Sequence, residues 1–256
     1  MRNWWIASLA FAMACAPKDS DGDGLTDAEE VELGTDPESA DGDDDGADDP
    51  DEIDAGTNPN YEWSYPIAEG NYLIGNCPDA PDEENSGPTG ESLYQNPWPA
   101  YQEGDTLANV AVTDSFDQEL YLYNFCGNYT LITLGAQWCG PCQNMASALP
   151  EEVEAIREEV PNFGVFEIVY EALDGSPADT ETLVEWSTTY ELDGIPVVVP
   201  TEESMDIAMH LNMQGTIPTT VLVGPDLEVI WSGLQHDGNY ISGASAILAA
   251  IGASEE

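Results

Sequence analysis

Residues 19–54 are too acidic to fold around an apolar core. Of these 36 residues, 18 are Asp or Glu and none is aromatic. Such a segment buries too little apolar surface to offset the conformational entropy that folding removes. It is therefore either a solvated linker or a structure that cations hold together, and the spacing of its acidic residues favours the second.

The segment is a tandem repeat with an offset of 22 residues. DSDGDGLTDAEEVELGTDP aligns with DGDDDGADDPDEIDAGTNP, and both copies contain D-x-D-x-D-G-x-x-D-x-x-E. Calcium takes six to eight oxygen ligands, which this spacing supplies from one loop. Carboxylates come from positions 1, 3, 5 and 9, a backbone carbonyl from position 7 and a bidentate glutamate from position 12. Glycine at position 6 permits the sharp turn.

The pattern predicts two calcium sites, each with five carboxylates and one carbonyl. The first consists of Asp19, Asp21, Asp23, Asp27 and Glu30 with the carbonyl of Leu25. The second consists of Asp41, Asp43, Asp45, Asp49 and Glu52 with the carbonyl of Ala47. The loops lack the preceding helix of an EF-hand, and over about residues 19–60 they resemble thrombospondin type 3 repeats of bacterial surface proteins. That resemblance implies a calcium-stiffened stalk, residues 15–60, with a dissociation constant of about 10⁻⁴–10⁻³ M.

The overall charge restricts the partners. The chain has 51 acidic and 3 basic residues, a net charge of −48. Nucleic acid and anionic membrane surfaces would repel it, so neither is an expected partner.

The first fourteen residues, MRNWWIASLAFAMA, predict a secretory signal peptide. Arg2 precedes an apolar run that ends in the small-x-small sequence Ala-Met-Ala, and the run is too short to span a bilayer as a helix. Cleavage after residue 14 would leave Cys15 first, which resembles a bacterial lipoprotein with a lipidated cysteine, although Ala12 stands where that family prefers Leu. We expect a protein exported to the bacterial cell envelope that contacts membrane only through this lipid. Plain secretion and a buried N-terminal helix are the alternatives.

Downstream, residues 61–103 predict an irregular connector and residues 104–254 an α/β domain. From Thr106 on, short apolar runs alternate with longer amphipathic ones, which is typical of a sheet with helices on both faces. The expected strands are 107–114, 130–138, 165–173 and 196–200, followed by a hairpin of 219–224 and 228–234. The expected helices are 142–160, 180–190, 204–211 and 240–251.

The sequence WCGPC places a cysteine pair directly after the apolar strand 130–138 and at the start of a helix. Unpaired N–H groups and the helix dipole stabilise an anion there, so the pattern predicts a reactive thiolate at Cys139. Cys142, one turn into the helix, is expected to resolve a mixed disulfide.

This motif, together with QGTIPTTVLVG, resembles thioredoxin, and the extra strand and helix before Pro218 resemble the exported TlpA-type thiol–disulfide oxidoreductases. The resemblance covers about residues 104–254 and implies a thioredoxin-like fold, a central mixed sheet flanked by helices. It implies a cis peptide at Ile217–Pro218 that helps to bind the substrate chain, with Trp138 beside the site. The redox chemistry needs no cofactor. Where the family carries a buried Asp that moves a proton for the resolving cysteine, this chain has Thr133, and Glu167 is a candidate replacement.

Other functions for the pair fit less well. Zinc would want a second C-x-x-C, haem attachment needs His where Gln143 stands, and a peroxidase needs an Arg closer than Arg157. A structural staple is the remaining alternative. The histidines His210 and His236 have no ligand spacing and are expected to be surface or packing residues.

The two further cysteines predict a Cys77–Cys126 disulfide, since exported proteins retain disulfides. The rival is a second redox pair that exchanges with the first. We predict a redox-active Cys139–Cys142 disulfide in an exported, lipid-anchored oxidoreductase, more reductase than oxidant. It would exchange with cysteine pairs of other exported proteins and with an unidentified electron donor. The rival function is a non-enzymatic calcium-binding adhesion or scaffold protein with a thioredoxin-like binding domain.

Overall fold

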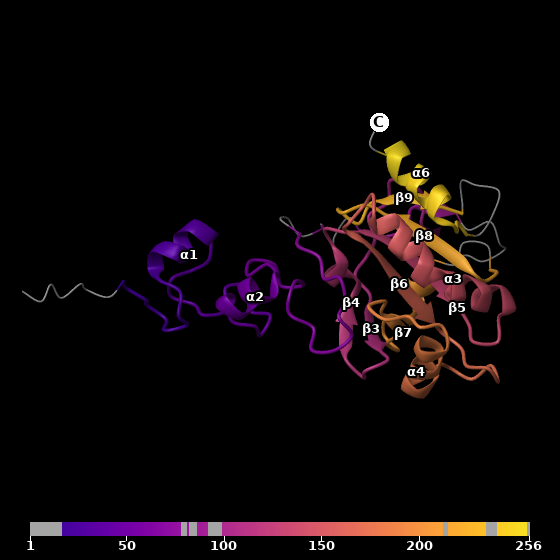
Figure 1. Cartoon of the computed structure of the whole chain (residues 1–256), viewed down its shortest axis with the longest axis horizontal. Coiled ribbons are helices and arrows are strands. Elements are labelled where there is room, and N and C mark those ends of the chain that lie inside the picture. The colour runs from indigo at the N-terminus through magenta and orange to yellow at the C-terminus, as the bar shows by residue number, and fades with distance from the viewer. Residues whose placement is uncertain are drawn as a thin grey trace, which may run out of the picture.

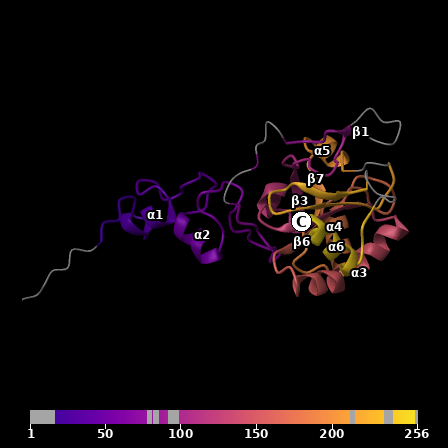
Figure 2. The ribbon, with the colours of Figure 1, turned by 90° about the horizontal axis from the view of Figure 1, so that it is seen from above.

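The computed structural model describes residues 17–77, 81, 86–91, 99–211, 215–233 and 240–254. The predicted signal peptide and Cys15 lie outside these residues. The acidic repeats form an elongated arm that projects from one side of the C-terminal domain, and α2 lies between α1 and the domain in both views (Figures 1 and 2).

Each repeat consists of an acidic loop followed by one short helix, α1 (Asp27–Leu33) or α2 (Asp49–Ala55). Both helices end at a glycine in the left-handed region, Gly34 with φ 87° and Gly56 with φ 82°, which glycine adopts without a steric cost. The 22-residue sequence repeat is therefore also a structural repeat.

A seven-stranded mixed sheet forms the centre of the C-terminal domain. Its order is β4-β3-β7-β6-β5-β8-β9, with β5, β6 and β7 parallel and the other pairings antiparallel. The strands are β3 (Ala111–Asp114), β4 (Glu119–Tyr121), β5 (Tyr129–Gly135), β6 (Phe163–Val169), β7 (Val197–Pro200), β8 (Thr219–Val223) and β9 (Val229–Ser232). A separate two-stranded sheet pairs β1 (Gly90–Glu91) with β2 (Pro99–Ala100). The mixed sheet confirms the predicted fold class.

One face of the sheet is covered by α3 (Gly140–Arg157), α4 (Thr180–Thr189) and α6 (Ala244–Ser254). The strand β5 is buried on both faces, which is why its sequence is nearly all apolar. Leu131 points to the helix-covered face, whereas its neighbour Ile132 points to the other, as the two-residue period of a strand requires.

The opposite face is covered mostly by irregular chain. Its core contains the 3₁₀ helix η1 (Leu122–Phe125), residues of α5 (Met205–Met209) and aromatic side chains from before the sheet, among them Tyr61 and Tyr101. The predicted connector is thus irregular in its backbone, but residues 61–77 pack on the sheet as part of the core. Apolar side chains without periodicity leave no helix or strand signal, so sequence analysis could not assign them to the domain.

Several element boundaries differ from the sequence expectation. The last helix begins at Ala244 and not at Tyr240, and α5 is shorter than the predicted 204–211. The strand β4 was not predicted, because three residues at a sheet edge are too few to show a period. Within the described part of the chain, no helix has the length and apolar character that crossing a membrane requires.

Candidate functional site

Cys139 and Cys142 are joined by a disulfide where β5 gives way to α3. Cys139 is the N-cap of α3, and its sulphur accepts a hydrogen bond from the backbone N–H of Cys142 at 3.2 Å. The same N–H would stabilise a thiolate at Cys139 after reduction. Cys139 keeps 4% of its surface exposed and Cys142 none, so an attacking sulphur can reach Cys139 more easily.

The resolving cysteine packs directly on the central strand. A Cβ on Gly135 would lie 3.1 Å from both Cβ and Sγ of Cys142, tighter than an ordinary contact. A glycine at the end of β5 therefore allows α3 to begin this close to the sheet.

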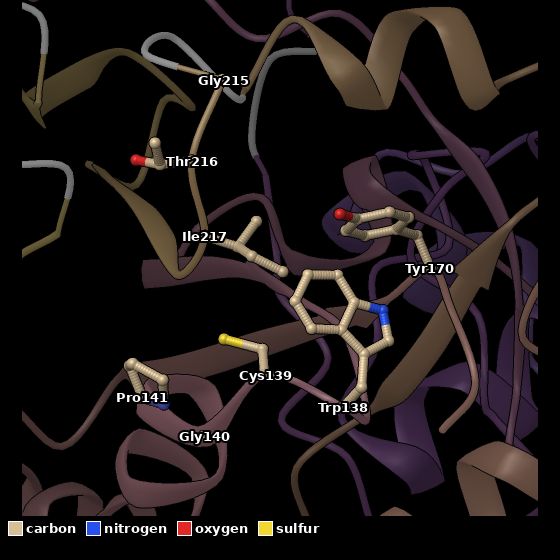
Figure 3. A pocket seen from close by; sticks show the side chains of 8 residues that line it. All are labelled: Trp138, Cys139, Gly140, Pro141, Tyr170, Gly215, Thr216 and Ile217. Carbon is tan, nitrogen blue, oxygen red and sulfur yellow. The ribbon is translucent and has the colours of Figure 1, made fainter. Parts of the chain in front are cut away.

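A groove of about 370 Å³ opens beside Cys139 (Figure 3). It is lined by the first turn of α3, by Trp138 and Tyr170, and by the loop that carries Ile217. Figure 3 shows the Ile217 side chain above Cys139 and Trp138, on the segment that leads into β8. The Ile217–Pro218 peptide is cis, as the resemblance implied.

Trp138 is held in place by a carboxylate. Its indole Nε1–H donates to Oε2 of Glu171 at 2.8 Å, while 46% of the residue stays exposed. An apolar ring with one polar anchor can contact a bound chain without collapsing into the groove. Sequence analysis did not identify Tyr170 or Glu171, since both follow β6 and reach the site only through the sheet order.

A buried carboxyl lies on the face of the sheet that carries Cys142. Thr133 and Gly135 are two residues apart on β5 and so share that face, and Glu167 on β6 is the register partner of Thr133. The Thr133 hydroxyl donates to Glu167, and Glu167 is fully buried. Burial raises the pKa of Glu167 to about 7, against the opposing effect of the hydrogen bond from Thr133. Glu167 can therefore hold or release a proton near neutral pH.

The Cys77–Cys126 disulfide lies at the opposite end of β5. Cys126 precedes this strand and Cys139 follows it, and Cys77 and Cys126 are bonded with a Cα–Cα distance of 5.3 Å. Seven strand residues span about 23 Å, so the two disulfides cannot exchange directly. This separation argues against the rival hypothesis, in which Cys77 and Cys126 form a second redox pair that exchanges with the first.

The carboxylates of the two acidic loops converge as the calcium pattern requires. Ligand oxygens of Asp19, Asp21 and Asp23 lie within 4.8 Å of one another, and so do those of the equivalent residues of the second loop, Asp41, Asp43 and Asp45. Leu25 and Ala47 occupy the seventh positions, where their N–H groups donate to Asp23 and Asp45.

The glutamates at position 12 complete both clusters. Glu30 and Glu52 are fully buried, and among the described residues neither carboxylate has a hydrogen-bond partner. Burial, then the charges of Asp45 and Asp43, raise the pKa of Glu52 to about 8. Buried, unpartnered oxygens in a ring of carboxylates are what a calcium ion would neutralise and bind, so the residues fit this ion.

The ninth positions differ between the copies. Asp27 was predicted as a ligand, and in the structure its two oxygens accept hydrogen bonds from Ser20 and from Lys18, which lies at 2.6 Å. The second copy has Ala40 in place of Lys18 and therefore lacks this ion pair. Asp49 is buried, with one oxygen bonded to the N–H of Gly42 and the other without a partner in the described structure.

His210 follows α5 and belongs neither to the lining of the groove beside Cys139 nor to the two acidic clusters. His236 lies outside the described residues.

Comparisons with known proteins bear on the two regions separately. The family model of the bacterial TSP3 repeat, a calcium-binding type, matches residues 19–40. No curated protein matches the chain.

Three solved structures illustrate the likeness of the C-terminal domain. The thioredoxin domain of a thiol-disulfide oxidoreductase from Bacteroides vulgatus is 12% identical with a TM-score of 0.47, over 61% of this chain and 100% of that one. An exposed lipoprotein thioredoxin from Streptococcus pneumoniae is 17% identical with a TM-score of 0.43, over 57% and 99%. A thiol-disulfide oxidoreductase from Bacteroides fragilis is 17% identical with a TM-score of 0.42, over 60% and 99%.

Proposed function

We propose that the protein is an exported, lipid-anchored thiol–disulfide oxidoreductase whose active cysteines are Cys139 and Cys142. One observation carries the proposal: the disulfide between them sits at the N-terminus of α3 and borders an open groove. A disulfide that only stapled the fold would not need a helix N-terminus or a groove beside the more exposed sulphur.

The exchange takes two steps. In the reduced protein, the Cys139 thiolate attacks one sulphur of a client disulfide, which forms a Cys139–client mixed disulfide and releases the other client sulphur as a thiolate that takes up a proton. Cys142 then loses its proton and attacks Cys139. This step forms the Cys139–Cys142 disulfide and releases the second client sulphur as a thiolate, which takes up a proton. It leaves the client reduced by two electrons and the protein oxidised by two.

Glu167 is the proposed acceptor for the Cys142 proton. It is buried on the same sheet face, bonded to Thr133, and its pKa lies between those of an ordinary carboxyl and an ordinary thiol. This position lets it take a proton when Cys142 attacks and return one when the pair is reduced again.

The clients are proposed to be cysteine pairs of other exported proteins, held along the groove by Trp138 and by the backbone at Ile217 and Pro218. The N-terminal signal sequence with Cys15 supports export to the cell envelope and a lipid anchor. The Gly-Pro pair between the cysteines, as in thioredoxin near −270 mV, favours reduction of clients over oxidation near −120 mV. An electron donor must then restore the thiols.

Calcium is proposed at both acidic loops, with Glu30 and Glu52 as bidentate ligands beside the aspartates at positions 1, 3 and 5. The bound ion would supply the positive charge that holds each loop closed. Asp49 would join the ligands, whereas Asp27 would stay with Lys18.

The test is an insulin-reduction assay with dithiothreitol, combined with client trapping. We expect turnover by the wild type and its loss in Cys139→Ser and in Cys142→Ser. Cys142→Ser should accumulate mixed disulfides that reductant releases, whereas Cys139→Ser should accumulate few, because Cys142 is fully buried. The double variant Cys77→Ser/Cys126→Ser, matched in chemistry but remote from the groove, should remain active. Trapping that is equal in both single variants, or stronger in Cys139→Ser, would contradict the assigned roles.

The rival function, a calcium-binding scaffold with an inert thioredoxin-like domain, predicts turnover no greater than that of Cys139→Ser. A redox titration of the Cys139–Cys142 couple then distinguishes a reductant from an oxidant.

A further inference from the structure

The two acidic loops are near-copies in sequence, and the second one, with α2, directly precedes the chain that enters the C-terminal domain. A Cβ added at Gly42 of the second loop, which aligns with Ser20 of the first, would lie 2.9 Å from the carbonyl oxygen of Pro59. The start of the second loop therefore packs on the segment that follows α2.

That neighbouring segment enters the core of the C-terminal domain within two residues. The backbone N–H of Tyr61 lies beside the carboxylate of Asp43 and donates to the carbonyl of Asn58 at 3.0 Å. The Tyr61 ring is only 4% exposed and belongs to the apolar cluster beneath the sheet, where its hydroxyl donates to the carbonyl of Tyr123 at 3.4 Å. A single residue thus contacts a loop carboxylate with its backbone and the domain core with its side chain.

Residues on either side of Tyr61 fix this segment to the domain. The side-chain amide of Asn58 donates to the carbonyl of Cys77 at 2.9 Å, and Cys77 is bonded to Cys126. The hydroxyl of Ser64, fully buried, donates to the carbonyl of Gly75 at 2.7 Å. The segment cannot move without disturbing contacts of the domain itself.

Charge decides whether the second loop stays closed. Its converging carboxylates repel one another, and Glu52 adds a buried carboxylate that lacks a hydrogen-bond partner among the described residues. A bound calcium ion would remove this repulsion and favour the closed loop, which is the form in which Gly42 packs on Pro59 and Asp43 lies beside Tyr61. Calcium binding and docking of the segment on the domain both favour the closed loop. Each therefore favours the other, and this coupling is reciprocal.

We propose that the second acidic loop, residues 41–52, is a calcium-dependent clasp of the C-terminal domain. Calcium bound there stabilises the domain, and docking of Tyr61 in turn raises the affinity of that loop for calcium. The first loop, residues 19–30, binds its ion independently of the domain. The inference rests on the calcium sites proposed above and not on the redox activity.

The experiment uses the full chain and a matched pair of variants. Asp21→Asn and Asp43→Asn remove the same charge from the same position of each loop. Calcium binding is followed by isothermal titration calorimetry. Unfolding of the domain is followed by near-ultraviolet circular dichroism, in chelator and in calcium at matched ionic strength.

We expect calcium to raise the unfolding midpoint of the wild-type domain by about 4 °C or more. Asp21→Asn should retain most of this shift, and Asp43→Asn should lose most of it. Tyr61→Ala, if its near-ultraviolet spectrum shows a folded domain, should weaken one of the two calcium affinities by about tenfold and leave the other unchanged.

Equal loss of the shift in Asp21→Asn and Asp43→Asn, or two bound ions with an unchanged midpoint, would overturn the clasp and leave the calcium sites standing. A chain that binds no calcium in the titration would overturn both. Neither result depends on turnover, so failure of the proposed redox function remains a separate outcome of the insulin assay.

Discussion

In the acidic repeats the buried side chains are carboxylates, whereas in the C-terminal domain they are aliphatic and aromatic. Glu30, Asp49 and Glu52 are fully buried, while Val31 on α1 is 71% exposed. In the domain, Leu131 and Phe166 are as deeply buried as those glutamates. In the repeats, acidic side chains are therefore buried and an apolar one is exposed, the reverse of the arrangement in the domain.

This difference shows two ways to offset the entropy of folding. The domain releases apolar surface from water, and its stability is a property of the chain alone. The repeats bury charges that repel one another, so we propose that their stability depends on a bound cation. The two regions should therefore respond in opposite ways to chelation and to core substitutions.

The largest expected effect is the loss of structure in the repeats when calcium is removed. The N–H groups of Gly22, Leu25, Gly46 and Ala47 donate to aspartates of the loops and should be protected only while the loops are closed. In chelator, we expect their hydrogen exchange to accelerate by on the order of 100-fold or more, and that of β5 far less. Exchange of the full chain, read by mass spectrometry with and without calcium, checks this. Equal protection of the repeats with and without calcium would mean that calcium does not stabilise them.

The next effect concerns the disulfide that ties the connector to the domain. Cys77 and Cys126 enclose a loop with a sequence separation of 49. Closing a loop of this size stabilises the folded state by about 4 kcal/mol through the unfolded chain. We expect Cys77→Ser/Cys126→Ser to lose roughly this much in urea unfolding. Cys139→Ser/Cys142→Ser, which opens a far shorter loop, should lose less. Free thiols at Cys77 and Cys126 in the exported protein, found by mass spectrometry without reductant, would remove this constraint.

The third expected effect concerns Glu167, a buried carboxyl of the C-terminal domain. The pKa of Glu167 is raised from 4.5 to about 7, so the folded state favours the protonated form. Its contribution to stability is complete below pH 4.5 and is lost as the pH rises through 7. Glu167→Gln should therefore match the wild type near pH 4 and be more stable by about 3 kcal/mol at pH 8.

Urea unfolding at both pH values measures this difference. Glu154→Gln, which removes an exposed charge from α3, should show no such pH dependence. A Glu167→Gln variant that gains nothing at pH 8 would mean that burial does not raise the pKa of Glu167. In the exchange reaction, the same variant should lose the step at which Cys142 gives up its proton.

What could be predicted from the sequence depended on whether a feature is local along the chain. The convergence of the loop aspartates and the pairing of the two cysteines were predictable because each follows from a local pattern, with its spacing fixed within about 12 residues. The strands β5, β6 and β8 were predictable from apolar runs. The docking of Tyr61 and Trp63 was not, because isolated aromatics in an irregular segment carry no period.

Two site features also depended on the fold. Glu167 could be named from the sequence, but its bond with Thr133 required the parallel register of β5 and β6. The ion pair of Lys18 with Asp27 was missed because the repeat pattern made the two copies look equivalent, although only the first is preceded by a lysine.

The smallest expected effect concerns the N-caps of α1 and α2, that is, whether helix capping also contributes to the stability of the repeats. Thr26 caps α1 in a reciprocal arrangement with Glu29, whereas Asp48 at the equivalent position of α2 makes no side-chain capping bond within the described structure. Removal of such a cap costs about 1 kcal/mol. Because α1 carries Glu30, this cost should appear as a roughly fivefold weaker affinity of the first loop for calcium in Thr26→Ala. Asp48→Asn should leave the second loop nearly unchanged.

Calorimetric titration of both variants measures the two affinities, and equal weakening would mean that the caps do not distinguish the copies. A weakening confined to Thr26→Ala would show that the ion closes a loop whose helix is already partly formed by its own sequence.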